Sequence, residues 1–275
     1  MMVKWPDLMA EFDRWEEAGR VATLWWRDDD AVMPTARLGR LLSIASGVPV
    51  SLAVIPADAQ QELAQWLAQY LRSAPKASAA VLQHGWRHLN HSSGGKKSEF
   101  PAERPRPEMA FELAAGWARL RDLFGSRAQS VLVPPWNRFD DSLLGLLAGC
   151  GLTGISRAGP RTSSAWAPGV IEANIHVDVV AWKGSREFVG EDAALGGLVK
   201  HLRARRLRAV CADEPTGILT HHLIQDEATD AFLDRLITAS VAHPAVRWLD
   251  AGEIFTSDVL NPDDPPRLSA FGSLR

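Results

Sequence analysis

Several polar residues in this sequence have the types and spacings of metal ligands and acid–base catalysts. Three adjacent carboxylates, Asp28, Asp29 and Asp30, follow the apolar residues 24–26, which are typical of a buried strand, with only Arg27 between them. Adjacent carboxylates repel one another, and each resists losing its water. A bound cation would stabilise them, so we expect Asp30 to be a metal ligand and Asp29 to be a general base. The alternative in which Asp28 is the base and Asp29 is the metal ligand, each one residue earlier, remains open at this point.

Two histidines supply the other expected ligands. His84 and His88 lie four residues apart in VLQHGWRH, a spacing that places both rings on one face of a helical turn. Two imidazoles can bind one divalent ion, and a carboxylate from another strand would complete a facial triad with open positions. Two ordinary histidines on a short helix are the alternative. By strand alternation Asp28 points away from Asp29, so we expect it to be a structural partner, for instance of an arginine.

The remaining candidates also follow predicted strands. His221 and His222 come after the run 216–220, and one imidazole facing the centre would be the general acid, for which we choose His221. A hydrogen-bonded structural histidine is the alternative there. The expected substrate contacts are Trp136, Asn137, Asp178, Trp182 and His222.

The chain alternates between short apolar runs and amphipathic segments. The predicted strands are 21–27, 50–55, 79–83, 130–134, 152–156, 171–177, 216–220 and 246–249. The predicted helices are 35–46, 57–73, 107–124, 140–149, 192–207 and 227–240. This alternation favours the α/β class, as a distorted (β/α) barrel of about seven parallel strands, similar to a TIM barrel. The carboxyl ends of its strands would bring the polar groups to one face. We expect one domain over 1–275, with its core in 21–250, loops at 90–106 and 157–170, and a loose tail at 259–275.

Composition excludes several classes of partner. Charged residues make up 23% of the chain and the net charge is −3, so no basic surface suggests nucleic acid. No run approaches the ~20 apolar residues of a membrane span, and the first residues do not resemble a secretory signal. We therefore expect a cytoplasmic protein with a small-molecule or oligosaccharide substrate. Cys150 and Cys211 are expected to be reduced thiols, and the oligomeric state is open.

The order of these motifs resembles that of the polysaccharide deacetylase family. The resemblance covers about residues 21–225 and rests on RDDDA, HGWRH, the Pro135-Trp136 strand end and the late Leu219-Thr220-His221. It implies a distorted (β/α) barrel and a metal-dependent hydrolase that cleaves an amide C–N bond, removing N-acetyl groups from sugars. It also implies zinc, or another first-row divalent metal, bound by an aspartate and two histidines. Matched by position, these ligands are Asp30, His84 and His88, with Asp29 as the base and His221 as the acid.

The sequence departs from the family pattern at two places. Ala31 replaces a usual glycine, and Val133 stands where an arginine partner of the base belongs; Arg27 or Arg138 could substitute for it. His91 is a competing ligand, and the lysines at 96 and 97 are expected to face solvent. Two alternative functions therefore stay open: hydrolysis of a cyclic amide or imide, and an inactive barrel that binds a sugar or a metal.

Overall fold

The computed structural model describes residues 2–161 and 167–256. The expected loose tail, 259–275, lies outside the described residues, and so do positions 162–166 of the expected loop 157–170.

Parallel strands form the centre of the described part of the chain. They make a nine-stranded sheet in the order β6-β5-β4-β3-β2-β1-β8-β7, and β9 pairs with β1 as well. All pairings between these strands are parallel. The strands are β1 Ala22–Ala31, β2 Pro49–Val54, β3 Ser78–His84, β4 Ala128–Val133, β5 Gly154–Ile155, β6 Ile171–Glu172, β7 Ile175–Asp178, β8 Thr216–Thr220 and β9 Val246–Trp248. The predicted α/β barrel class is confirmed.

Each of the eight predicted strand segments overlaps a strand, and one of them holds two, which gives nine strands in all among the described residues. The run 171–177 is divided into β6 and β7 at Ala173 and Asn174. The backbone of Asn174 bonds elsewhere: its carbonyl accepts from Trp25 Nε1, and its N–H donates to Glu214 Oε1. Because these groups are used by side chains, the strand ladder is interrupted there.

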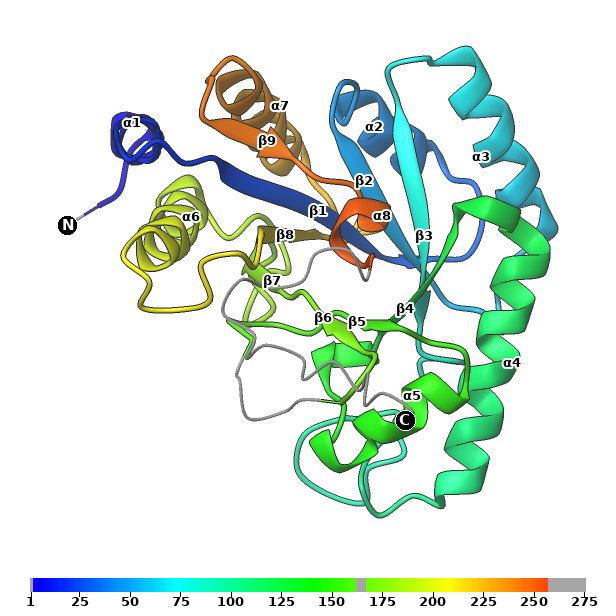
Figure 1. Cartoon of the computed structure of the whole chain (residues 1–275). Coiled ribbons are helices and arrows are strands. Elements are labelled where there is room, and N and C mark those ends of the chain that lie inside the picture. The colour runs from blue at the N-terminus through cyan, green and yellow to red at the C-terminus, as the bar shows by residue number, and fades with distance from the viewer. Residues whose placement is uncertain (1, 162–166, 257–275) are drawn as a thin grey trace, which may run out of the picture.

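Helices surround the sheet, as Figure 1 shows. They are α1 Trp5–Glu17, α2 Ala36–Ile44, α3 Gln61–Ser73, α4 Arg106–Phe124, α5 Leu144–Gly149, α6 Glu191–Arg206, α7 Glu227–Val241 and α8 Ala251–Ile254. Short 3₁₀ turns lie at Gly125–Arg127, Pro135–Asn137 and Asp141–Leu143. The sequence analysis did not predict α1, although Trp5, Leu8, Phe12 and Trp15 are buried at helical spacing along one face. None of the described helices is both long and apolar enough to cross a membrane.

The interior of the barrel is filled at the end where the strands begin. Helix α8 lies inside the ring of strands in Figure 1, and Phe255, directly after it, packs edge-to-face on Trp25 with ring centroids 6.0 Å apart. Gly154, the first residue of β5, makes room for this helix, because an added Cβ would lie 2.7 Å from the Phe255 ring. The other end of the barrel, where the strands finish, is left for polar groups.

Candidate metal and catalytic site

The end of β1 directs its three carboxylates to different places. The pairing of β1 with β2 shifts between Asp28 and Ala31, where two residues of β1, Asp29 and Asp30, lie opposite one residue of β2, Ala53. Asp30 lies in this irregularity with φ 73°, a left-handed conformation that is uncommon for any residue but glycine. Because a bulge changes the direction of a side chain, Asp29 and Asp30 can both face the barrel end although they are adjacent.

His84 is the last residue of β3 and has one nitrogen free for a ligand. Its Nδ1 lies 3.0 Å from the carbonyl oxygen of Val133, which can only accept, so Nδ1 carries the proton. In the neutral ring this leaves Nε2, 3.1 Å from Asp30 Oδ1, with a lone pair for a metal, whereas in the metal-free group Asp29 and Asp30 raise the pKa of His84 and Nε2 donates a proton to Asp30. A backbone carbonyl holding the other ring nitrogen is the usual arrangement around a metal-ligating histidine.

His88 reaches the same point from a turn rather than a helix. The expectation of a helical HxxxH segment is wrong, because β3 ends at His84 and His88 has φ 57°. The two rings nevertheless lie together, with centroids 5.1 Å apart, and His88 Nε2 is 3.6 Å from Asp30 Oδ1. Asp30, His84 and His88 thus offer three ligand atoms that all lie within 4.8 Å of one another.

The electrostatics of this group also suit a cation. Burial alone would raise the pKa of Asp30, but the hydrogen bond from His84 and the charges of the surrounding histidines hold it well below its usual range. The carboxylate is therefore ionised at neutral pH. Burial lowers the pKa of His88, and His84 lowers it further, which keeps this imidazole neutral and able to bind a metal. One carboxylate and two imidazoles form the donor set of a zinc-type site.

A second group of possible ligands fits an ion less well. His176, His201 and Glu214 offer atoms within 4.8 Å of one another near the start of β8. However, Nδ1 of His176 accepts the N–H of Gly217 at 3.0 Å, so the proton of a neutral ring must be on Nε2. A nitrogen that carries its proton offers no lone pair, whereas His84 has the opposite tautomer. The position of the ring protons therefore favours the first group.

Arg27 holds Asp29 with two hydrogen bonds. Its Nε lies 2.9 Å from one carboxylate oxygen and its Nη2 3.1 Å from the other. Both side chains are buried, at 0% and 4% exposure. Nη2 also donates to Oδ1 of Asn137, and Nη1 donates to the hydroxyl and carbonyl of Ser156. Arg27 thus contacts the predicted base, and Arg138 does not take this place, because its Nη1 donates to the carbonyl of Lys97.

Asp28 and His222 form a separate buried pair. His222 Nδ1 is 2.5 Å from Asp28 Oδ1, while the His222 N–H and the Thr220 hydroxyl both donate to Oδ2. The side chains are 0% and 1% exposed. Asp28 is a structural residue as expected, but its partner is a histidine instead of an arginine. A side chain as buried as His222 has no surface for a substrate, so this part of the substrate-contact prediction is wrong.

His221 lies on the other side of the site beside Trp182 and Asp178. Its Nδ1 is buried and has no hydrogen-bond partner among the described residues. Its ring packs edge-to-face on Trp182, with centroids 4.7 Å apart, and Trp182 Nε1 donates to Asp178 Oδ2 at 2.7 Å. The pKa of Asp178 is raised above its usual value. Burial and the nearby charge of Asp29 raise it, and they outweigh the hydrogen bonds to its carboxylate and the charge of His221, which lower it. Asp29 of β1, Asp178 of β7 and His221, directly after β8, therefore lie near one another.

Glu99 supports the histidine turn and was not predicted. It is fully buried, and its carboxylate accepts the N–H groups of Trp86 at 3.1 Å and Arg87 at 2.7 Å, between the two histidines. Gly85 has φ 59°, and a Cβ there would lie 1.9 Å from Glu99 Oε2. Glu99 belongs to the segment expected to be an irregular loop, where no neighbouring motif distinguishes it from a solvated glutamate. The competing ligand His91 is not part of the metal group.

Trp136 packs on the ring of a predicted metal ligand, and Asn137, the next residue, lines a neighbouring cavity. The Trp136 ring lies 4.5 Å from the His88 ring, and Lys97 Nζ lies 5.8 Å from the same indole. Both residues have φ 57°. With Asp30 and His88, four non-glycine residues of one site are therefore left-handed, a concentration of strain that is typical of functional sites.

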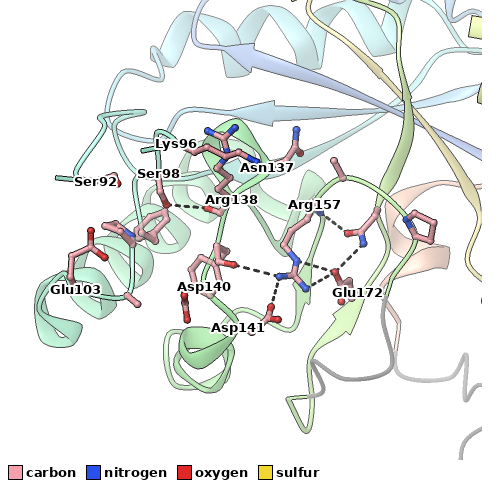
Figure 2. Close-up of a pocket in the computed structure, with 17 residues that line it drawn as sticks. Ser92, Lys96, Ser98, Glu103, Asn137, Arg138, Asp140, Asp141, Arg157 and Glu172 are labelled. Atoms are coloured by element: carbon pink, nitrogen blue, oxygen red, sulfur yellow. Dashed lines mark hydrogen bonds and ion pairs between the residues drawn. The ribbon is translucent and has the colours of Figure 1, made fainter. Parts of the chain in front are cut away.

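The cavity has a volume of about 500 Å³ and is polar (Figure 2). Of the predicted site residues only Asn137 lines it, so it adjoins the metal group without containing it. Arg157 stands in its wall and bonds to Asp141 and Glu172, as the dashed lines in Figure 2 show. The cavity therefore begins at Asn137, which also contacts Arg27, and none of the three proposed metal ligands lines it.

Comparisons with known proteins identify the fold of this chain. No protein-family model matches the chain, and no curated protein matches it by sequence. A structure from Mycobacterium smegmatis that is assigned to the polysaccharide deacetylases has 17% identity and a TM-score of 0.53, with 90% of each chain covered. A mutant of a CE4-family pseudoenzyme with restored enzymatic activity has 14% identity and a TM-score of 0.50, over 86% of this chain and 68% of the other. The chain thus has the fold of the polysaccharide deacetylases, the family that its motifs resemble.

Proposed function

We propose that this protein is a metal-dependent hydrolase of an amide C–N bond and that it deacetylates an N-acetylated sugar or a related small molecule. One observation carries the proposal. The three ligand atoms of Asp30, His84 and His88 lie together beside Asp29, which Arg27 holds in a buried ion pair. We propose zinc as the metal, with other first-row divalent ions as alternatives, since imidazole and carboxylate donors suit them all.

The proposed chemistry divides between the two sides of the site. A bound divalent ion supplies Lewis acidity, which lowers the pKa of water and polarises a carbonyl. Asp29, oriented by two bonds from Arg27, takes the proton from the attacking water. His221 donates a proton to the departing nitrogen, so that the products are acetate and an amine. Asp178 contacts Trp182, which in turn packs on His221 and keeps its ring in position.

Substrate contacts are proposed for the exposed aromatic and polar groups around the ligands. Trp182 is 45% exposed and so presents an aromatic face to a sugar ring. Trp136 packs on the His88 ring, and Asn137 lines the neighbouring cavity. The inactive-barrel alternative rested on the missing arginine at Val133, and the bond from Arg27 to Asp29 removes that reason.

Metal content and turnover test this proposal together. The purified protein is loaded with zinc, dialysed and tested on N-acetyl sugars and on cyclic ureides, with amine release and ring opening as separate measurements. We expect amine release, its loss together with the metal in His84→Ala, and its loss with the metal retained in Asp29→Asn. His91→Ala is the matched control, because this histidine is near in sequence but outside the ligand group, and it should keep both. Ring opening without amine release, or an active metal-free His84→Ala protein, would refute the proposal.

A further inference from the structure

The cavity beside the metal group has a cationic end that the proposed reaction does not use. Lys96 and Arg138 line it together with Asn137, and the Arg138 guanidinium binds the carbonyl of Lys97 at 2.9 Å. In Figure 2 these side chains lie at one end of the cavity, and Glu103 and Asp141 lie away from them. Among the described residues, no carboxylate makes an ion pair with Lys96, Lys97 or Arg138.

The third cation of the cavity differs from these. Arg157 Nη1 lies 2.5 Å from Asp141 Oδ1, and its Nη2 lies 2.8 Å from Glu172 Oε1. Two carboxylates therefore neutralise this guanidinium, which makes it part of the wall. Asp140 also lines the cavity, and its carboxylate accepts the N–H of Ser142 at 3.0 Å but keeps its negative charge, next to Asp141 in the chain. The uncompensated positive charge of the cavity is thus concentrated at the end next to Asn137.

This end is joined to the reacting groups by short contacts. Asn137 Oδ1 accepts from Arg27 Nη2 at 2.5 Å, and the same guanidinium holds Asp29. Lys97 Nζ lies over Trp136, whose ring contacts His88. A substrate whose amide is at the metal ligands would therefore extend over Trp136 and Asn137 toward Lys96 and Arg138. Lysine provides a point charge and arginine a planar fork, and both suit carboxylate and phosphate oxygens.

We propose that this cavity binds an anionic substituent of the substrate, a carboxylate or a phosphate, through Lys96 and Arg138. The inference rests on the proposed function and names its substrate class: an N-acetylated sugar with an acidic group rather than a neutral one. In a chain with a net charge of −3, such an acidic substrate gains specificity from this local positive end.

The test compares matched substrates. Hydrolysis is measured for a neutral N-acetylhexosamine and for its counterparts with a carboxylate or a phosphate substituent, at low and high salt. We expect kcat/KM to favour one or both acidic substrates. The preference should fall roughly tenfold in Lys96→Gln and in Arg138→Gln, mainly through KM, and it should weaken with salt. The carboxylate and phosphate arms identify which group the cavity takes. Lys76→Gln, which removes an exposed lysine just before the start of β3 and outside the cavity lining, is the control for net charge and should keep the preference.

Binding separates this inference from the proposed function. Calorimetry with Asp29→Asn measures the affinity for the same three sugars without turnover. Tighter binding of an acidic sugar that Lys96→Gln abolishes would support the cavity assignment even if no deacetylation were found. Because Arg138 also holds the Lys97 carbonyl, Lys96→Gln is the decisive variant if Arg138→Gln does not fold. Equal affinity for the neutral and acidic sugars, or a preference unchanged in Lys96→Gln, would overturn the inference.

Discussion

Arg27→Met should destabilise the protein strongly, because it leaves the Asp29 carboxylate buried without a partner. Arg27 and Asp29 are 0% and 4% exposed and share two hydrogen bonds, of 2.9 and 3.1 Å. Removing one member of a buried ion pair costs about 3–5 kcal/mol. With an m-value of about 3 kcal/mol per molar urea, this lowers the unfolding midpoint by roughly 1–1.7 M.

Urea unfolding followed by tryptophan fluorescence measures this shift. The matched control is Arg104→Met, which breaks another two-bonded pair, to Glu112, whose side chains are 10% and 19% exposed. Water reaches that pair more than it reaches the pair of Arg27, so its loss should cost less than the loss of Arg27. The double variant Arg27→Met/Asp29→Asn removes both charges and should regain part of the lost stability. Equal midpoints for Arg27→Met and Arg104→Met would refute the view that Asp29 depends on Arg27.

Three further predictions concern the turn, a helix cap and the metal. Gly85→Ala should cost more than about 2 kcal/mol and weaken metal binding roughly 10- to 100-fold, because its Cβ would collide with Glu99 in a left-handed turn. Asp226→Ala should cost about 1 kcal/mol at neutral pH, since its carboxylate caps α7 through Thr229. Burial alone would raise the pKa of Asp226, but the N–H groups of Phe188 and Thr229 hold it below its usual value. This charge therefore stabilises the fold above the unfolded pKa, and the difference from wild type should narrow as pH falls through the folded pKa. A chelator should abolish amide hydrolysis, and added zinc should restore it.

The two substitutions have matched controls. Gly145→Ala lies in α5, where an added Cβ meets nothing within 4 Å, so stability should be equal or slightly higher and metal affinity should be unchanged. Asp226→Asn keeps an acceptor for the cap and should lose less than Asp226→Ala in thermal unfolding. A pH-independent loss in Asp226→Ala would contradict a role for the charge, and full activity in chelator would contradict metal dependence.

The strand segments and the polar strand ends could be predicted because both follow from local patterns. Apolar runs and helical spacing identify most elements, and parallel strands bring their carboxyl ends to one face. This places His84, His88 and the Asp28–Asp30 cluster together. Helix α1 was missed because its four buried aromatic and aliphatic residues alternate with charges, a pattern interpreted only as evidence against a signal segment.

The parts that could not be predicted depend on contacts between distant residues. The bulge that directs Asp30, the left-handed conformation of His88 and the burial of Glu99 have no signature within their own segments. His221 and His222 are adjacent histidines, and only the hydrogen bond between His222 and Asp28 identifies His222 as the structural one. The choice of Arg27 over Arg138 as the partner of Asp29 likewise depends on which side of β1 faces the interior.

The four left-handed residues of the site have a consequence for any attempt to make this protein more heat-resistant. Asp30, His88, Trp136 and Asn137 each hold a backbone geometry that disfavours a side chain by about 1–2 kcal/mol. Glycine at position 88 or 136 would relax that geometry, so selection for melting temperature alone would favour exchanging these residues. The same exchange removes an imidazole or an indole from beside the proposed metal. Substitutions that raise the melting temperature at these positions therefore weaken the proposed metal site. A thermostable variant obtained there should be screened for metal content.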